Sequence, residues 1–129
     1  MYYLNKMYVY YNPNPDGART NDCVVRAIAK ATNQSWTDVY VGLFVKGYEM
    51  KDMLASNAVW SAYLQEHDFT RHVVANNCPN CYTVRDFAND HSNGVYVLGT
   101  GSHAVTIVDG DYYDTWDSGD ELPLYYFRR

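Results

Sequence analysis

The sequence predicts an α+β fold in one domain, and two patterns along the chain support this prediction. Between residues 23 and 91 most segments carry apolar side chains at helical spacing behind a capping residue. From Gly94 onward apolar residues recur with a period of two, which is typical of half-buried strands. Helices followed by antiparallel strands indicate an α+β architecture. The 129 residues contain no linker, repeat or low-complexity segment, so we expect a single domain over residues 1–129.

The N-terminal part is expected to begin with a strand and continue with a helix. Residues 1–11 are rich in Tyr and Val and predict a strand, and the Asn, Pro and Gly residues of 12–17 predict a turn. Asn21 or Asp22 can cap a helix over residues 23–31. The apolar stripe of that helix consists of Val24, Ala27, Ile28 and Ala31.

Further helices are expected where a capping residue precedes an apolar run. The capping residues are Ser35, Asn57 and Thr83. Asp86 follows Thr83 at the spacing of a capping box. The expected helices cover residues 36–45, 51–55, 58–67 and 84–91. The expected strands cover residues 69–75, 95–100, 103–108, 111–116 and 122–127.

Composition excludes some classes of partner. The net charge is −5 and no basic stripe is present, which argues against a nucleic-acid or anionic-membrane partner. The 14 tyrosines are more typical of half-buried strands than of a recognition surface. No apolar run approaches the ~18 residues of a membrane span, and the N-terminus lacks the pattern of a secretory signal. We therefore expect a cytoplasmic protein whose three cysteines are reduced.

Cys23 is the first candidate functional residue, because it begins a predicted helix directly behind Thr20, Asn21 and Asp22. A structural cysteine would more usually lie in the middle of an apolar face. A helix N-terminus stabilises a thiolate, and the thiolate is the nucleophilic form. The position therefore favours a reactive thiol over a small buried residue that happens to begin a helix.

A predicted hairpin fixes the position of a histidine. Asp109-Gly110 suits a type I′ turn, so Val108 is expected to face Asp111 across it. Continuing this register along both strands, His103 faces Trp116. His103 also follows a Gly-rich turn at the start of its strand, where a side chain is usually accessible.

The same register selects a carboxylate for His103. Val105 faces Asp114 and shares a face of the sheet with His103, so Asp114 is the diagonal neighbour of the histidine, roughly 7–8 Å away between Cα atoms. Asp117 falls on the other face if the strand stays regular, and it is kept as the reserve partner. A carboxylate that accepts from one ring nitrogen leaves the other free to take a proton. Cys23, His103 and Asp114 are thus a candidate nucleophile, base and orienting group.

This order of residues resembles the papain-like cysteine peptidases. "DC" at 22–23 resembles the start of the nucleophile helix in bacteriocin-leader peptidases, and "DTW" at 114–116 resembles the "NSW" of plant and lysosomal members. The chain also resembles small papain-like proteins of bacteriophages and mobile elements. The resemblance implies that Asp114 orients the histidine and that Trp116 shields their hydrogen bond from water. It also implies an N-terminal nucleophile helix and further helices packed on a C-terminal antiparallel sheet.

The sequence departs from that family at the oxyanion donor. The family usually has a glutamine about six residues before the cysteine, where this chain has Gly17. The backbone N–H of Cys23 remains one donor. Asn21 is the nearest side-chain candidate for a second donor, and Asn12 and Asn14 are others.

Cys78 and Cys81 form a C-x-x-C motif that indicates little alone. A structural zinc ion would need two more ligands, with His72 or His91 as candidates, and a redox pair would need a βαβ setting. A tight turn before the helix capped by Thr83 is the favoured interpretation.

The resemblance implies a small cysteine peptidase, or an amide or isopeptide hydrolase, that acts on a protein or peptide through a thioester acyl-enzyme. No metal or organic cofactor is expected. Two alternatives stay open. The first is a non-catalytic, phage-type binding or inhibitor protein on the same fold. The second is acyl transfer instead of hydrolysis by the same three residues.

Overall fold

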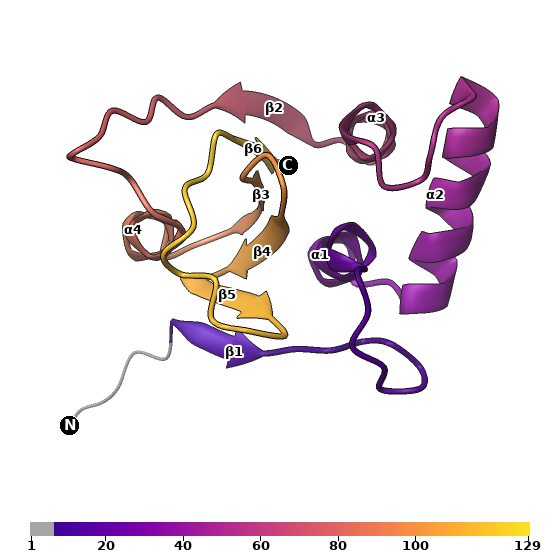
Figure 1. The fold of residues 1–129 in the computed structure, drawn as a ribbon, viewed down its shortest axis with the longest axis horizontal. Helices are drawn as coiled ribbons and strands as arrows, with labels where there is room; N and C mark the ends of the chain where they lie inside the picture. The colour runs from indigo at the N-terminus through magenta and orange to yellow at the C-terminus, as the bar shows by residue number, and fades with distance from the viewer. Residues whose placement is uncertain (1–6) are drawn as a thin grey trace.

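The computed structural model describes residues 7–129, and Figure 1 shows its helices arranged around a central sheet. The helices are α1 (Cys23–Thr32), α2 (Trp36–Met50), α3 (Asn57–Glu66) and α4 (Val84–Asp90). The strands are β1 (Tyr8–Tyr10), β2 (Thr70–Val73), β3 (Val95–Gly99), β4 (Ala104–Val108), β5 (Asp111–Asp114) and β6 (Tyr125–Arg128). The predicted α+β class is confirmed at this level.

The strands form one mixed sheet in the order β1-β5-β4-β3-β6-β2. β3, β4 and β5 form an antiparallel meander, β6 pairs with β3, and β2 pairs with β6. The expected purely antiparallel sheet is wrong at one edge, because β1 runs parallel to β5. Of the strand predicted over residues 1–11, the first six residues lie outside the described part of the chain.

Helices cover both faces of the sheet (Figure 1). α1 packs across the meander on one face, with α2 and α3 outside it, and α4 packs on the other face. Alternate strand residues enter two separate cores. Val97, Ala104 and Phe127 enter the core shared with the first three helices, whereas Leu98 and Val105 enter the core beneath α4. α1 is therefore fixed directly against the strands of the meander.

The ends of α2 and α3 differ from the prediction in two ways, and at the start of α1 Asp22 holds the N-cap position without a side-chain cap hydrogen bond. α2 continues to Met50, and the short helix expected at 51–55 is a turn, because Lys51 is left-handed and its N–H bonds back to the last carbonyls of α2. α3 is capped by Ser56 instead of Asn57, since the Ser56 hydroxyl accepts from the N–H of Val59.

The capping box of α4 is confirmed. The Thr83 hydroxyl accepts from the N–H of Asp86 at 3.1 Å, and the Asp86 carboxylate accepts from the N–H of Thr83 at 3.0 Å. The preceding loop contains one further correction. The structure joins Cys78 and Cys81 in a disulfide, so the expectation of three reduced cysteines is wrong and Cys23 is the free thiol.

Within residues 7–129, none of the helices combines the length and the apolar character that a membrane crossing needs.

Candidate functional site

Cys23 is the first residue of α1 and is half-buried. The first N–H groups of a helix have no partner within the helix, so the sulfur lies at the positive end of the helix dipole. Asp22 occupies the N-cap position without making a side-chain cap hydrogen bond. Its carboxylate accepts instead from the Arg26 guanidinium and, at 2.8 Å, from the Trp36 indole N–H.

His103 lies immediately before β4, at the end of a tight loop. The N–H of Thr100 donates to the carbonyl of His103 at 2.9 Å and closes this loop, and Gly101 has φ 98°, a conformation that suits glycine. The predicted hairpin register is confirmed, because Val108 pairs with Asp111. The loop and the hairpin together set the position of the imidazole.

His103 and Asp114 are in direct contact, as the register predicted. Nε2 of His103 lies 2.6 Å from Oδ2 of Asp114, which leaves Nδ1 for the thiol of Cys23. The backbone N–H of Ala104 also contributes to lowering the pKa of the Cys23 thiol. The structure therefore brings together all three residues that the sequence selected.

The electrostatics favour an ion pair between Cys23 and His103. Burial raises the pKa of Cys23, but the hydrogen bonds from His103 and Ala104 and the positive charges of His103 and Arg26 outweigh it, so the net pKa is lowered. Burial lowers the pKa of His103, but hydrogen bonds to Asp114 and Cys23 outweigh it and raise that pKa to about 9. A thiolate beside an imidazolium is the nucleophilic state of a cysteine.

Asp114 is completely buried, and each of its carboxylate oxygens has two donors. Oδ2 accepts from His103 and, at 2.6 Å, from the hydroxyl of Ser118. Oδ1 accepts from Arg26 at 2.9 Å and from the N–H of Thr115 at 2.8 Å. Burial raises the pKa of Asp114, but these hydrogen bonds and the charges of His103 and Arg26 lower it overall. The carboxylate is therefore held ionised against the histidine.

Arg26 connects the helix of the nucleophile to the strand of the carboxylate. Its side chain is only 4% exposed and forms ion pairs with both Asp22 and Asp114. Sequence reasoning missed this residue and also missed Ser118. One local signal was present, since Asp22 and Arg26 stand at the i, i+4 spacing of a helical ion pair.

Trp116 lies beside His103, whereas the carboxylate of Asp117 does not. The Trp116 ring lies 4.9 Å from the His103 ring between centroids and is 43% exposed, so it covers one side of the imidazole. Asp117, the reserve partner, lies elsewhere. It accepts from the Tyr112 hydroxyl and from the N–H of Gly119 at 3.1 Å, and it forms an ion pair with Arg85.

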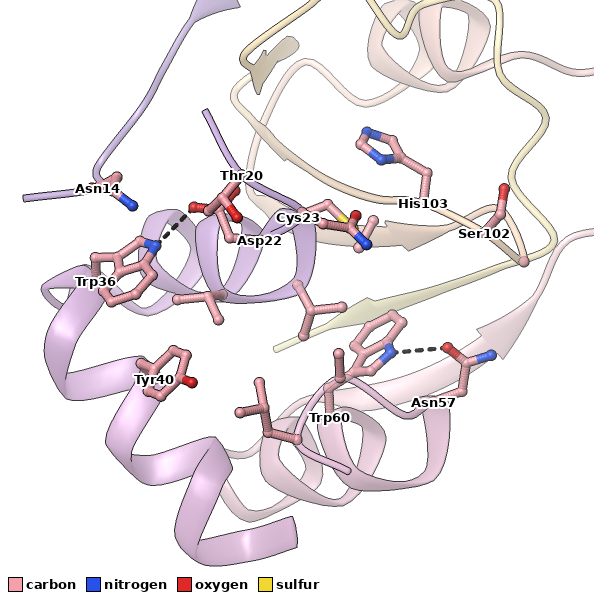
Figure 2. Close-up of a pocket in the computed structure, with 17 residues that line it drawn as sticks. Asn14, Thr20, Asp22, Cys23, Trp36, Tyr40, Asn57, Trp60, Ser102 and His103 are labelled. Carbon is pink, nitrogen blue, oxygen red and sulfur yellow. Dashed lines mark hydrogen bonds between the residues drawn. The ribbon is translucent and has the colours of Figure 1, made fainter. Parts of the chain in front are cut away.

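The candidate oxyanion donors lie at different places around Cys23. Asn21 is exposed and lines the cavity beside the thiol. Figure 2 shows Asn14 on the Trp36 side of this cavity, away from His103. The Asn12 amide donates to the carbonyls of Gly17 and Ala18 in its own loop. The side chain of Asn21 and the backbone N–H of Cys23 therefore remain the candidate donors to an oxyanion.

In the described residues, no group of three or more His, Cys, Asp or Glu side chains is arranged to hold a metal ion. Cys78 and Cys81 are bonded to each other. His72 bonds to the hydroxyl of Thr70 at 2.9 Å, and His91 bonds to a carbonyl of α4 at 2.8 Å. These contacts disfavour the zinc interpretation of the C-x-x-C motif.

No protein-family model, curated protein or solved structure matches this chain. The arrangement of Cys23, His103 and Asp114 is therefore the main guide to function.

Proposed function

We propose that the protein is a small cysteine hydrolase that cleaves a peptide, amide or isopeptide bond, on a papain-like variant of its α+β fold. One observation carries the proposal. His103 lines the same cavity as the thiol at the start of α1 and lowers its pKa, and Nε2 of His103 is 2.6 Å from the buried carboxylate of Asp114. A nucleophile, a base and an orienting group in contact are the parts that nucleophilic catalysis requires.

The acylation step follows from these contacts. Nδ1 of His103 takes the proton of Cys23, and the thiolate attacks the substrate carbonyl carbon to form a C–S bond. The N–H groups at the start of α1 and the side chain of Asn21 stabilise the oxyanion. When the tetrahedral intermediate collapses, the C–N bond breaks and His103 donates its proton to the leaving amine. The product of this step is a thioester on Cys23.

Deacylation uses the same groups. His103 takes a proton from a water molecule, the water oxygen bonds to the thioester carbon, and the C–S bond breaks to release the acid and the thiol. Asp114 stays ionised throughout and holds the imidazolium that forms in each half of the cycle. An amine in place of water would give acyl transfer, which product analysis distinguishes. No metal or organic cofactor takes part in the proposed cycle.

One observation favours the alternative of a binding protein in which Cys23 is idle. The solvent face of α2 carries an exposed apolar stripe, and exposed apolar patches often mark interaction sites. The stripe consists of Val41, Phe44, Val45 and Tyr48. A binding function would not need the ion-paired arrangement of Cys23 and His103, however, so hydrolysis is the better supported proposal.

The proposal is tested with an activated ester such as p-nitrophenyl acetate. We expect a burst of p-nitrophenol and an acetyl group on Cys23, detected by mass spectrometry. Cys23→Ala should abolish both, and His103→Ala should slow acylation by about 10²–10⁴-fold. Asp117→Asn is the control, because Asp117 bonds to Tyr112 and not to His103, and it should leave the burst unchanged. Acylation no faster than that of a free cysteine would overturn the proposal.

A further inference from the structure

A cavity of about 370 Å³ opens beside Cys23, between α1, α2 and the start of α3. Figure 2 shows Trp36 and Tyr40 of α2 on one side, Trp60 and Asn57 of α3 on another, and Cys23 and His103 along the rim. A peptide whose carbonyl reached the thiol would therefore place a neighbouring side chain at this opening. The cavity is thus positioned to select a substrate.

One wall of the cavity is formed by aromatic and aliphatic side chains. The rings of Trp36 and Tyr40 are stacked, with centroids 5.1 Å apart. Trp60 is buried and packs against the aromatic rings of β6. Aliphatic side chains extend this wall, and they are Val24, Val25, Leu54 and Ala55. A surface of this kind binds apolar groups by removing them from water. Polar side chains line the rest of the cavity, and they include Asn14, Thr20, Asn21 and Ser102.

The two indole N–H groups of the lining are already engaged within the protein. The Trp36 indole donates to Asp22 at 2.8 Å, and the Trp60 indole donates to Asn57 at 3.0 Å (Figure 2). Asp22, the carboxylate in the lining, uses one oxygen for Trp36 and the other for Arg26. His103 is engaged by Asp114 and Cys23. Among the described residues, the lining therefore offers no uncompensated charge to a ligand.

The size of the cavity, its aromatic wall and the pairing of its charged groups point to one class of occupant. A cavity of roughly 150 Å³ already holds benzene, so about 370 Å³ accommodates an aromatic or branched aliphatic side chain. A lysine, arginine or glutamate side chain would lose its hydration here without gaining a counter-ion.

We propose that this cavity is a specificity pocket for a large, neutral, apolar side chain next to the bond that is cleaved. This inference rests on the proposed function, since it names the substrate class of the same thiol. Tyr40, Leu54 and Trp60 are the residues that set the preference, because they form its apolar walls.

The test uses reagents that alkylate Cys23 irreversibly and differ in one side chain. These are N-acetyl amino-acid chloromethyl ketones of Phe, Leu, Ala, Glu and Lys, in which the thiolate displaces chloride. We expect the Phe and Leu reagents to alkylate Cys23 about tenfold or more faster than the Ala reagent. The Glu and Lys reagents should react no faster than the Ala reagent. Equal rates for the Phe, Leu and Ala reagents, or a preference for a charged side chain, would show that the cavity is not an apolar specificity pocket.

Iodoacetamide separates this inference from the proposed function, because it is too small to use the cavity. Ordinary reactivity of Cys23 toward iodoacetamide would contradict the proposed function. Enhanced reactivity without side-chain preference would contradict the specificity pocket alone.

Two alanine-to-phenylalanine variants test the cavity itself, because one places a ring in it and the other places a ring outside it. Ala55 is exposed and lines the cavity, whereas Ala58 is exposed on α3 and does not. Ala55→Phe should remove the advantage of the Phe and Leu reagents over the Ala reagent, and the iodoacetamide rate of the same variant reports how reactive Cys23 remains. Ala58→Phe should change neither. If Ala55→Phe kept the full preference, the side chain would have to bind elsewhere and the proposal would be wrong.

Discussion

Nε2 of His103 lies 2.6 Å from Oδ2 of Asp114, and the Asp114 side chain is inaccessible to solvent. A carboxylate in this position fixes which ring nitrogen faces Cys23 and stabilises the imidazolium. The buried partners of Asp114 show that this contact belongs to a larger network, because Arg26 and Ser118 also bind the same carboxylate.

Replacing the carboxylate should lower the pKa of His103. In Asp114→Asn the imidazolium loses a charged hydrogen-bond partner, while burial, which lowers the pKa, remains. We expect the pKa of His103 to fall from about 9 by one unit or more. NMR titration of the His103 ring protons measures it. Asp117→Asn is the control, because Asp117 bonds to Tyr112 and not to His103, and an unchanged pKa in Asp114→Asn would contradict the role given to Asp114.

Removing Arg26 should strongly destabilise the fold. Arg26→Met leaves Asp22 and Asp114 buried without their shared cation, a change that typically costs roughly 3–5 kcal/mol. The pKa of Asp114 is lowered in the folded protein, so the stability it contributes is present above its unfolded pKa and is lost as the pH falls. The cost of Arg26→Met should therefore be largest near neutral pH and shrink as the pH falls below about 4.

Urea unfolding of both proteins between acid and neutral pH measures this cost. Arg85→Met is the control, because Arg85 is 42% exposed and its ion pairs lie at the surface. Its cost should stay below about 1 kcal/mol. Equal costs for Arg26→Met and Arg85→Met would show that the buried network does not hold α1 to the sheet.

The sequence predicted the site better than it predicted the sheet. Cys23 could be selected because helix caps are local signals. The contact of His103 with Asp114 could be predicted because one hairpin turn fixes the register of both strands. The parallel pairing of β1 with β5 has no comparable turn signal, since the two segments are far apart in the chain.

The missed residues share a physical reason. Arg26 lies in a helix that was read for its apolar stripe, and its second partner, Asp114, is brought to it only by the packing of α1 on the sheet. Ser118 lies beyond the end of β5, where a period of two no longer gives the direction of a side chain. The Cys78–Cys81 disulfide was missed because the C-x-x-C motif was judged from the expected compartment.

Gly99 directly precedes the loop that carries His103. It should be intolerant of a side chain. A Cβ on Gly99 would overlap the ring of Tyr125 on the paired strand β6, and Tyr125 is buried against Trp60. Gly99→Ala should lower the free energy of unfolding by about 1–3 kcal/mol. Adding Tyr125→Leu should make the two changes less than additive in urea unfolding. Strict additivity would contradict the steric explanation.

The number of free thiols tests whether Cys78 and Cys81, in the loop before α4, are joined in a disulfide. Cys23 is free, and Cys78 is bonded to Cys81. Protein unfolded without a reductant should give one thiol in a DTNB assay, and the same protein after reduction should give three. A Cys23→Ala variant should give none without reductant. Three thiols in freshly prepared protein without reductant would instead support the original expectation of reduced cysteines.

The pH dependence of the Cys23 alkylation rate, compared between the wild type and His103→Ala, shows whether His103 activates the thiol. The lowered pKa of Cys23 and the raised pKa of His103 mean that the thiolate persists below the pH at which an ordinary thiol is protonated. In the wild type, iodoacetamide should therefore still react rapidly at pH values where an ordinary thiol is protonated. In His103→Ala, the midpoint should move toward about 8.5, the value of a free cysteine. A wild-type midpoint near about 8.5 that does not depend on His103 would contradict the catalytic role of Cys23.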